Sequence, residues 1–128
     1  MKDHAVSLPR IASECELEIL SPDLPEDRLV SKVFASDLMS DVLAFTPPGV
    51  LLVTALVSKQ SIVTANIAEA VGVIYTRGKR PDEDAVGLAA RLGVPLMATG
   101  LSTWGICRRL QDLGLLGICN DEENAEGS

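Results

Sequence analysis

Three short aliphatic segments, each followed by a stretch with helical spacing, constrain the fold of this chain more than any other feature. Residues 49–55 (GVLLVTA), 73–76 (VIYT) and 95–99 (PLMAT) have the nearly continuous apolar character of strands that are covered on both faces. The stretches between them are about a dozen residues long, which suits the crossover helix that joins two parallel strands. The alternation therefore predicts right-handed βαβ units and a parallel sheet.

The ends of the predicted helices are marked by residues that favour the start or the end of a helix. A serine before the first turn accepts a hydrogen bond from a free backbone amide, a proline or an acidic residue suits the first turn, and a glycine suits the end. The predicted helices are residues 59–71 between Ser58 and Gly72, a helix from Pro81 to Gly93, and a helix from Ser102 to about residue 113.

The N-terminal third has a less regular pattern. The elements it predicts are a short helix at 8–15, an edge strand at 17–20, a strand at 29–35 and a helical turn at 38–45. In the first of these, Ile11 and Cys15 are expected to face inward. After residue 116 the chain becomes polar and acidic, so we expect one folded domain at 1–116 and a disordered tail at 117–128.

The core that these elements build must be aliphatic. Hydrophobic residues make up 47% of the 128 residues, but aromatic residues make up only 3%. A core of valine, leucine, isoleucine and alanine favours layered α/β packing over an aromatic-rich β-sandwich.

The negative charge of the chain belongs to its two ends. The formal net charge is −7, with seven acidic and three basic residues in 1–28 and four acidic residues in 121–128. Residues 29–120 hold seven acidic and eight basic residues and are nearly neutral. This balance argues against binding to a nucleic-acid backbone, so no nucleic-acid partner is expected.

Cysteine usage and the apolar segments predict a cytoplasmic protein. Cys15, Cys107 and Cys119 are an odd number without CxxC spacing, which favours reduced thiols over a disulfide framework. The first residues lack the apolar region of a secretory signal. The longest apolar run, residues 50–57, is far shorter than a membrane span, so no membrane association is expected.

Residues for catalysis are scarce. The single histidine, His4, lies near the N-terminus, so a nucleophile–histidine arrangement lacks a base. Gly78 and Lys79 resemble the end of a phosphate loop, but Val73 replaces its first glycine and Arg80 its serine or threonine. We therefore expect no enzyme activity, no cofactor and no metal site.

Asp37 and Asp41 are the remaining acidic pair of interest. Four residues apart on a helical turn, they could act as an acid and a base or hold a divalent cation. The alternative is that Asp37 is an ordinary helix-start residue and Asp41 an exposed polar one. The alternative is favoured, and both residues are kept as secondary candidates.

A binding rim is predicted where the parallel strands end. Each strand ends in a threonine and leads into a helix, and the carboxyl edge of a parallel sheet is where ligands bind. One basic cluster, residues 77–80, lies beside this edge. The alternative is that these are ordinary strand, cap and loop residues. The candidate ligand-binding residues, suited to a small anionic ligand, are Thr54, Ser58, Thr76, Arg77, Lys79, Thr99, Ser102 and Thr103.

The order of several segments resembles that of stand-alone DRTGG-domain proteins. The segments are SDLMSDVLA at 36–44, VIYTRGKRPDED at 73–84, RLGVPLMAT at 91–99, RRLQDLGL at 108–115 and, upstream, residues 11–30. The resemblance covers about residues 5–116. The five residues that name the family are not spelled out; Asp27-Arg28 and Thr76-Arg77-Gly78 are the nearest fragments.

The resemblance implies a three-layer α/β/α sandwich around a mostly parallel sheet of about five strands. This fold is similar to the N-terminal domains of HPr kinase/phosphorylase and of Mur ligases. Such domains occur beside CBS domains in pyrophosphatases, in some phosphate acetyltransferases and near iron-hydrogenase genes, and they tend to form dimers.

Two functions follow as expectations. The first is a non-catalytic regulatory or scaffolding domain that acts through homodimerisation and a protein partner, such as an enzyme or a hydrogenase-associated complex. Residues 38–45 and 115–118 are candidate dimer segments. The alternative is a sensor domain that binds a nucleotide or a phosphometabolite at the rim.

Overall fold

A six-stranded sheet organises the described part of the chain. The structure, a computed structural model, describes residues 5–22 and 24–118. The strand order is β2-β7-β6-β5-β4-β8. The strands are β2 (Glu18–Ile19), β7 (Leu96–Ala98), β6 (Gly72–Tyr75), β5 (Leu51–Thr54), β4 (Lys32–Ala35) and β8 (Leu116–Gly117). All neighbouring pairs are parallel except β2 and β7, so the sheet is mostly parallel.

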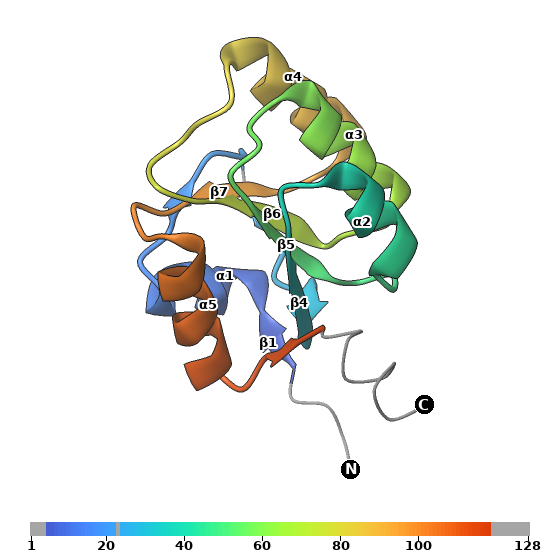
Figure 1. Cartoon of the computed structure of the whole chain (residues 1–128). Helices are drawn as coiled ribbons and strands as arrows, with labels where there is room; N and C mark the ends of the chain where they lie inside the picture. Colours follow the sequence, from blue (N-terminus) through green and yellow to red (C-terminus); the bar gives the residue numbers. More distant parts are fainter. Residues whose placement is uncertain (1–4, 23, 119–128) are drawn as a thin grey trace, which may run out of the picture.

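Helices cover both faces of this sheet (Figure 1). Among the described residues they are α1 (Leu8–Glu14), α2 (Met39–Phe45), α3 (Lys59–Ile67), α4 (Glu83–Leu92) and α5 (Thr103–Asp112). Helices α2, α3 and α4 lie on one face, and α1 and α5 lie on the other. The predicted three-layer α/β/α sandwich is confirmed.

The buried side chains form one aliphatic core on each face of the sheet. Ile74 and Met97 belong to the core under α1 and α5, whereas Val73 and Tyr75 belong to the core under α2, α3 and α4. This division follows from the alternation of side chains along a strand. Ile11 and Cys15 are 0% and 3% exposed, so both face inward as predicted.

The predicted strand at 29–35 is in fact two strands in two sheets. β3 (Leu29–Val30) pairs antiparallel with β1 (Val6–Ser7), and β4 pairs with β5 in the large sheet. The division occurs at Ser31, whose carbonyl accepts a hydrogen bond from the Leu116 amide at 2.9 Å. A distant segment therefore sets where the strand divides.

Helix α3 ends four residues earlier than predicted. Glu69 takes a left-handed backbone conformation, with φ +58°, and ends the helical path. The Val71 amide then donates to the Val50 carbonyl at 2.8 Å, so residue 71 already approaches the sheet.

The described fold continues two residues past the predicted domain boundary at 116. β8 pairs Leu116 with Lys32 and Gly117 with Val33, and the Ile118 amide donates to the Val33 carbonyl at 2.9 Å. This pairing adds a sixth strand to the sheet. Residues 119–128 of the predicted tail lie outside the described residues, as does His4.

None of the helices in the described ranges is long and apolar enough to cross a membrane.

Candidate functional site

Strands β4, β5, β6 and β7 follow one another across the sheet in one direction, and the chain turns back only after β7, when α5 leads to β8 beside β4. The loop after β6 leads to α4 on one face, whereas the loop after β7 leads to α5 on the other face. A ligand crevice in an open parallel sheet forms where two neighbouring loops separate in this way. Because β6 and β7 are paired neighbours, the loop of Thr76, Arg77 and Lys79 lies beside the loop of Thr99 and Ser102.

The three strand-end threonines do not converge on one pocket. Thr54 is level with Tyr75 in the register of β5 and β6, and Tyr75 belongs to the core under α2, α3 and α4. Thr76 is one residue further along and next to Thr99, so alternation directs both toward the α5 face. The predicted rim is therefore divided between two faces.

Asp37 holds the end of β5, a role that sequence reasoning missed. Its Oδ1 accepts hydrogen bonds from the Thr54 hydroxyl at 3.0 Å and from the Ala55 amide at 2.7 Å. Helix α2 begins two residues later, with Leu38 at its N-cap position. Asp41 lies in the first turn of α2 and contributes to no such contact among the described residues.

The loops that follow β6 and β7 are joined by hydrogen bonds between their backbones. The Gly78 amide donates to the Thr99 carbonyl and the Arg77 amide to the Leu101 carbonyl, both at 2.8 Å. Arg77 and Gly78 both have positive φ, +58° and +71°, which forms the turn that allows these bonds. These two amides are therefore already used, and contact with a ligand here would fall to side chains.

The hydroxyl groups near the loops after β6 and β7 differ in their hydrogen-bond partners. Thr99 Oγ1 accepts from the Leu101 amide at 3.2 Å, and Ser102 Oγ accepts from the Gly105 amide at 3.1 Å as the N-cap of α5. Thr76 is fully buried, and its hydroxyl has no hydrogen-bond partner among the described residues.

Two further candidate residues lie at helix starts. Thr103 is half-buried at the start of α5. Ser58 is exposed, and its side chain makes no cap hydrogen bond to α3.

One side chain of the basic cluster at 77–80 is engaged in an ion pair. Arg80 forms a two-pronged ion pair with Glu18 on the edge strand β2. Both side chains are about half exposed, so the pair joins two surface segments with little gain in stability. Arg77 and Lys79 are exposed and form no ion pair with a described residue.

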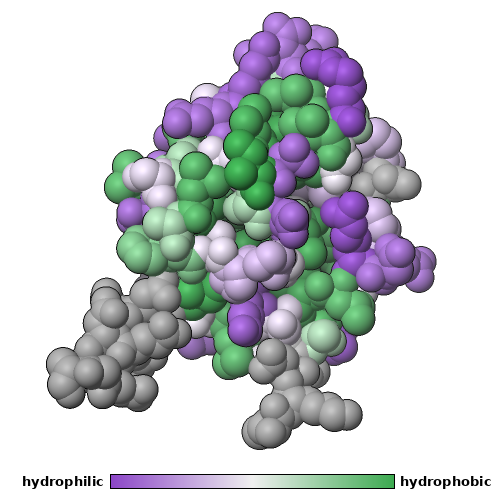
Figure 2. Space-filling model, turned by 90° about the vertical axis from the view of Figure 1, so that its right-hand side faces the viewer, coloured by the Kyte–Doolittle hydropathy of each residue, from purple (hydrophilic) through white to green (hydrophobic). Residues whose placement is uncertain are grey.

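Aliphatic and aromatic side chains reach the surface on α2 and α3, two helices that pack against each other. Four of them, which we call the α2–α3 surface, are between 41% and 62% exposed: Leu43, Phe45, Val63 and Ile67. Leu38, just before α2, is 58% exposed. Figure 2 looks onto the side of the molecule that carries these helices and shows hydrophobic groups at the surface among hydrophilic ones.

The other candidate dimer segment, residues 115–118, begins in the core, since Leu115 is 2% exposed.

The described residues hold no group of three or more metal-ligating side chains. Asp37 is instead directed at Thr54 and Ala55. The chemistry that this arrangement offers is recognition through hydroxyl groups, two free basic side chains and apolar contact.

The comparisons with known proteins show a likeness in structure. No family model and no curated protein matches the chain. A crystal structure of the CBS and DRTGG domains of the regulatory region of a Clostridium perfringens pyrophosphatase, complexed with its activator diadenosine tetraphosphate, matches with a TM-score of 0.69. The two chains are 15% identical, and the match covers 86% of this chain and 48% of the other.

The likeness is one of fold. It supports the DRTGG-like fold that the sequence resemblance implies. This chain spans about half the length of the chain it matches, and the CBS and DRTGG domains together make up that longer chain.

Proposed function

We propose that this chain is a non-catalytic regulatory domain that acts through homodimerisation and through a protein partner. The observation that carries the proposal is the α2–α3 surface, where four large apolar side chains from two neighbouring helices are exposed. The DRTGG-like fold, seen in the regulatory region of a pyrophosphatase, supports a regulatory role.

The energetics of the α2–α3 surface favour its burial against a second copy. Removing apolar area from water contributes about 25 cal/mol per Å², and a stable interface buries roughly 1,200–2,000 Å² in total. In a twofold dimer the same patch is used by both copies, so each exposed side chain contributes twice. Leu43 on α2 and Ile67 on α3 are therefore proposed to lie in the dimer interface.

The proposal predicts that a charge in this surface separates the dimer. We expect Leu43→Glu and Ile67→Glu each to raise the dimer dissociation constant at least tenfold, because a carboxylate would have to be buried without a partner. Light scattering during size-exclusion chromatography measures the mass of each variant. Leu92→Glu is the matched control, since Leu92 is an exposed leucine at the end of α4, outside the surface. Equal masses for all three variants and the native chain would contradict the proposal.

The alternative function is a sensor for a nucleotide or a phosphometabolite. Arg77 and Lys79 carry the observation that favours it, since both are exposed and form no ion pair within residues 5–22 and 24–118. They lie beside the buried hydroxyl of Thr76, which has no hydrogen-bond partner within those ranges. The structurally similar pyrophosphatase region was crystallised with a nucleotide activator. Phosphate groups suit arginine and lysine side chains.

Thermal unfolding against a panel of nucleotides, with diadenosine tetraphosphate included, tests this alternative. A ligand at a hundred times its dissociation constant adds about 2.7 kcal/mol to the free energy of unfolding. We expect a rise in melting temperature that is lost in Arg77→Ala/Lys79→Ala and kept in Arg91→Ala, which removes an exposed arginine on α4. A rise that survives the double substitution would place the ligand elsewhere, and no rise with any nucleotide would contradict the alternative.

A further inference from the structure

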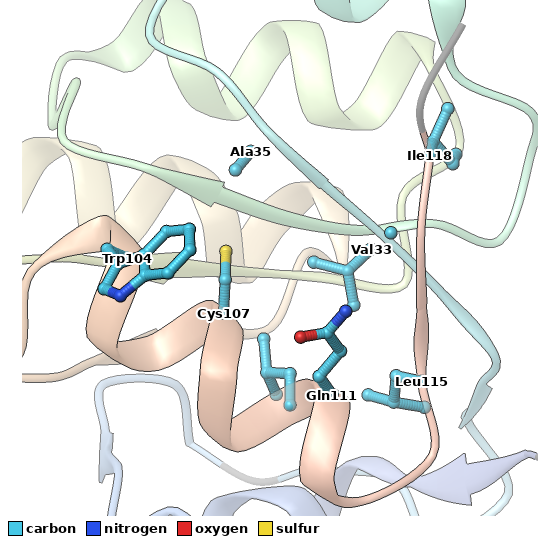
Figure 3. Close-up of a pocket in the computed structure, with 9 residues that line it drawn as sticks. Val33, Ala35, Trp104, Cys107, Gln111, Leu115 and Ile118 are labelled. Atoms are coloured by element: carbon cyan, nitrogen blue, oxygen red, sulfur yellow. The ribbon is translucent and has the colours of Figure 1, made fainter. Parts of the chain in front are cut away.

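The cavities on the two faces of the sheet differ in chemistry. The groove between α5 and β4 is lined mostly by apolar side chains, and the Cys107 side chain projects into it (Figure 3). A cavity of about 330 Å³ near the ends of α3 and α4 holds charged and amide groups instead. Val71 and Val94, which line this cavity, come just before β6 and β7 begin. It therefore lies at the opposite edge of the sheet from Thr76 and Thr99.

Arg28 supplies the positive charge of this cavity. Its amide donates to the Pro25 carbonyl at 3.2 Å, and its carbonyl accepts from the Leu8 amide at 3.0 Å, so its backbone is fixed. The guanidinium Nη1 is 3.5 Å from the Val71 carbonyl oxygen, which leaves most of the guanidinium donors for a ligand. Arg28 is partly buried and forms no ion pair with a residue in the described ranges. Such a guanidinium suits a carboxylate, which it can bind through two parallel hydrogen bonds.

Glu69 supplies a negative charge to the same cavity. It follows α3 in a left-handed backbone conformation, with φ +58°, whereas α4 ends at Gly93, with φ +74°. Both residues line the cavity, but glycine adopts this conformation with far less strain than glutamate. Glu69 is exposed and forms no ion pair with Arg28 or with another described residue. The cavity therefore presents two opposite charges that do not pair with each other, which suits a ligand that carries both charges.

The helix ends at this cavity favour a cation beside Glu69. Helices α3 and α4 pack against each other, and the last carbonyl groups of a helix carry partial negative charge. The Asn66 side chain adds an amide oxygen. Ala70 and Val94, which are 8% and 5% exposed, add an apolar wall. The cavity thus combines a group for a carboxylate, groups for an ammonium ion and an apolar surface.

We propose that this cavity binds a free α-amino acid with an aliphatic side chain. The carboxylate binds the Arg28 guanidinium, the ammonium group binds Glu69 and Asn66, and the aliphatic side chain packs against the apolar wall. The volume is at the lower end of the range for small-molecule sites, about 300–1,000 Å³. A second cavity of about 170 Å³ adjoins the first, since Arg28 and Val94 line both, and it offers room for a longer side chain. This site does not rest on the proposed function.

An NMR titration of the amide signals of the full chain with L-leucine tests the site. We expect saturable shifts for Glu69, Val71 and Val94, while the signal of Gly78 at the opposite edge of the sheet stays unchanged. N-acetyl-L-leucine lacks the ammonium group and L-leucinamide lacks the carboxylate, so each should bind at least tenfold more weakly. Glycine lacks the aliphatic side chain and should also bind at least tenfold more weakly.

Two substitutions test the two charges separately. Arg28→Lys keeps the positive charge but loses the paired donors, and Glu69→Gln removes the negative charge. Each should weaken the binding of L-leucine at least tenfold. Arg108→Lys and Glu83→Gln are the matched controls, because both residues are exposed, one on α5 and the other at the opposite end of α4. Both controls should bind L-leucine as the native chain does, and the amide spectrum shows whether each variant is folded.

Three results would overturn the proposal. The first is the absence of saturable shifts up to about 10 mM L-leucine, ten times a millimolar dissociation constant. The second is equal binding of L-leucine, N-acetyl-L-leucine and L-leucinamide, which would mean that the two charges are not recognised. The third is L-leucine binding that folded Arg28→Lys and folded Glu69→Gln both retain at native strength.

Discussion

Asp37 shows how a single side chain at the surface fixes the end of a buried strand. Its carboxylate receives both the hydroxyl of Thr54 and the amide of Ala55, so it positions the loop that leads from β5 to α3. A hydrogen bond to a charged group contributes roughly 1.5–3 kcal/mol when it is well shielded, and less at a surface.

We expect Asp37→Ala to lower the free energy of unfolding by about 1–2 kcal/mol, measured by urea denaturation. Asp37→Asn keeps one acceptor oxygen and should lose less. Asp41→Ala is the matched control, with an expected loss of roughly 0.5 kcal/mol because Asp41 contributes only through the dipole of α2. The described role of Asp37 would be wrong if both alanine variants were equally stable.

Tyr75, the single tyrosine, is fully buried, and its hydroxyl is 2.8 Å from that of Ser61 on α3. The Ser61 hydroxyl donates to the Ser58 carbonyl at 2.7 Å, so it accepts from Tyr75. Burial raises the pKa of Tyr75, and the Ser61 hydrogen bond acts in the opposite direction with smaller effect.

The raised pKa has a direct consequence for stability in base. An unfolded tyrosine loses its proton near pH 10, before the folded one does, so this stability is complete below about pH 10 and is lost as the pH rises through the folded pKa. Tyr75→Phe should cost about 1 kcal/mol at pH 7 and make the decline between pH 9 and 11 shallower. Urea denaturation across this range measures both effects. An unchanged pH dependence would show that Tyr75 does not contribute to the decline.

At the residue scale, the sequence identified the right segments but not the partners within them. Thr54, Thr76 and Thr99 all end strands as predicted, yet strand alternation and the twist of the loops divide them between two faces. Asp37 and Thr54 are 17 residues apart, and no local pattern indicates that they meet.

Among the elements, helix starts show how far local chemistry determines structure. The sequence predicts Ser58 and Ser102 as N-caps of α3 and α5. Ser102 Oγ accepts from the Gly105 amide, but Ser58 makes no cap hydrogen bond with its side chain. A serine cap contributes about 1 kcal/mol only when this bond is formed.

We therefore expect Ser102→Ala to lower the free energy of unfolding by about 1 kcal/mol and Ser58→Ala to lower it by less than about 0.3 kcal/mol. Thermal or urea unfolding of the two variants provides the comparison. Similar losses would mean that Ser58 caps α3 in solution.

Element types were predictable because they depend on spacing within about a dozen residues. The helices at α1, α2, α4 and α5 and the strands β5, β6 and β7 all follow from apolar spacing and capping residues. Pairings between distant segments were not predictable in this way. β8 joins β4 across more than 80 residues of sequence, and β1 pairs with β3 in a two-residue ladder.

At the scale of the whole molecule, the near neutrality of residues 29–120 and the exposed apolar side chains on α2 and α3 carry the functional account. A strongly charged fold would favour a nucleic acid or a membrane surface as partner. A nearly neutral fold with exposed leucine, isoleucine, valine and phenylalanine favours association with protein, and a second copy of the chain is the partner that is always present.

Sedimentation equilibrium of the native chain tests this central claim most directly. The account predicts a mass near twice 13.6 kDa at tens of micromolar, falling toward 13.6 kDa on dilution, and for Leu43→Glu a fall to 13.6 kDa that occurs at concentrations at least tenfold higher. A native chain that stays at 13.6 kDa at every concentration up to about 100 μM would contradict the account, since a stable interface of ordinary size binds more tightly than this.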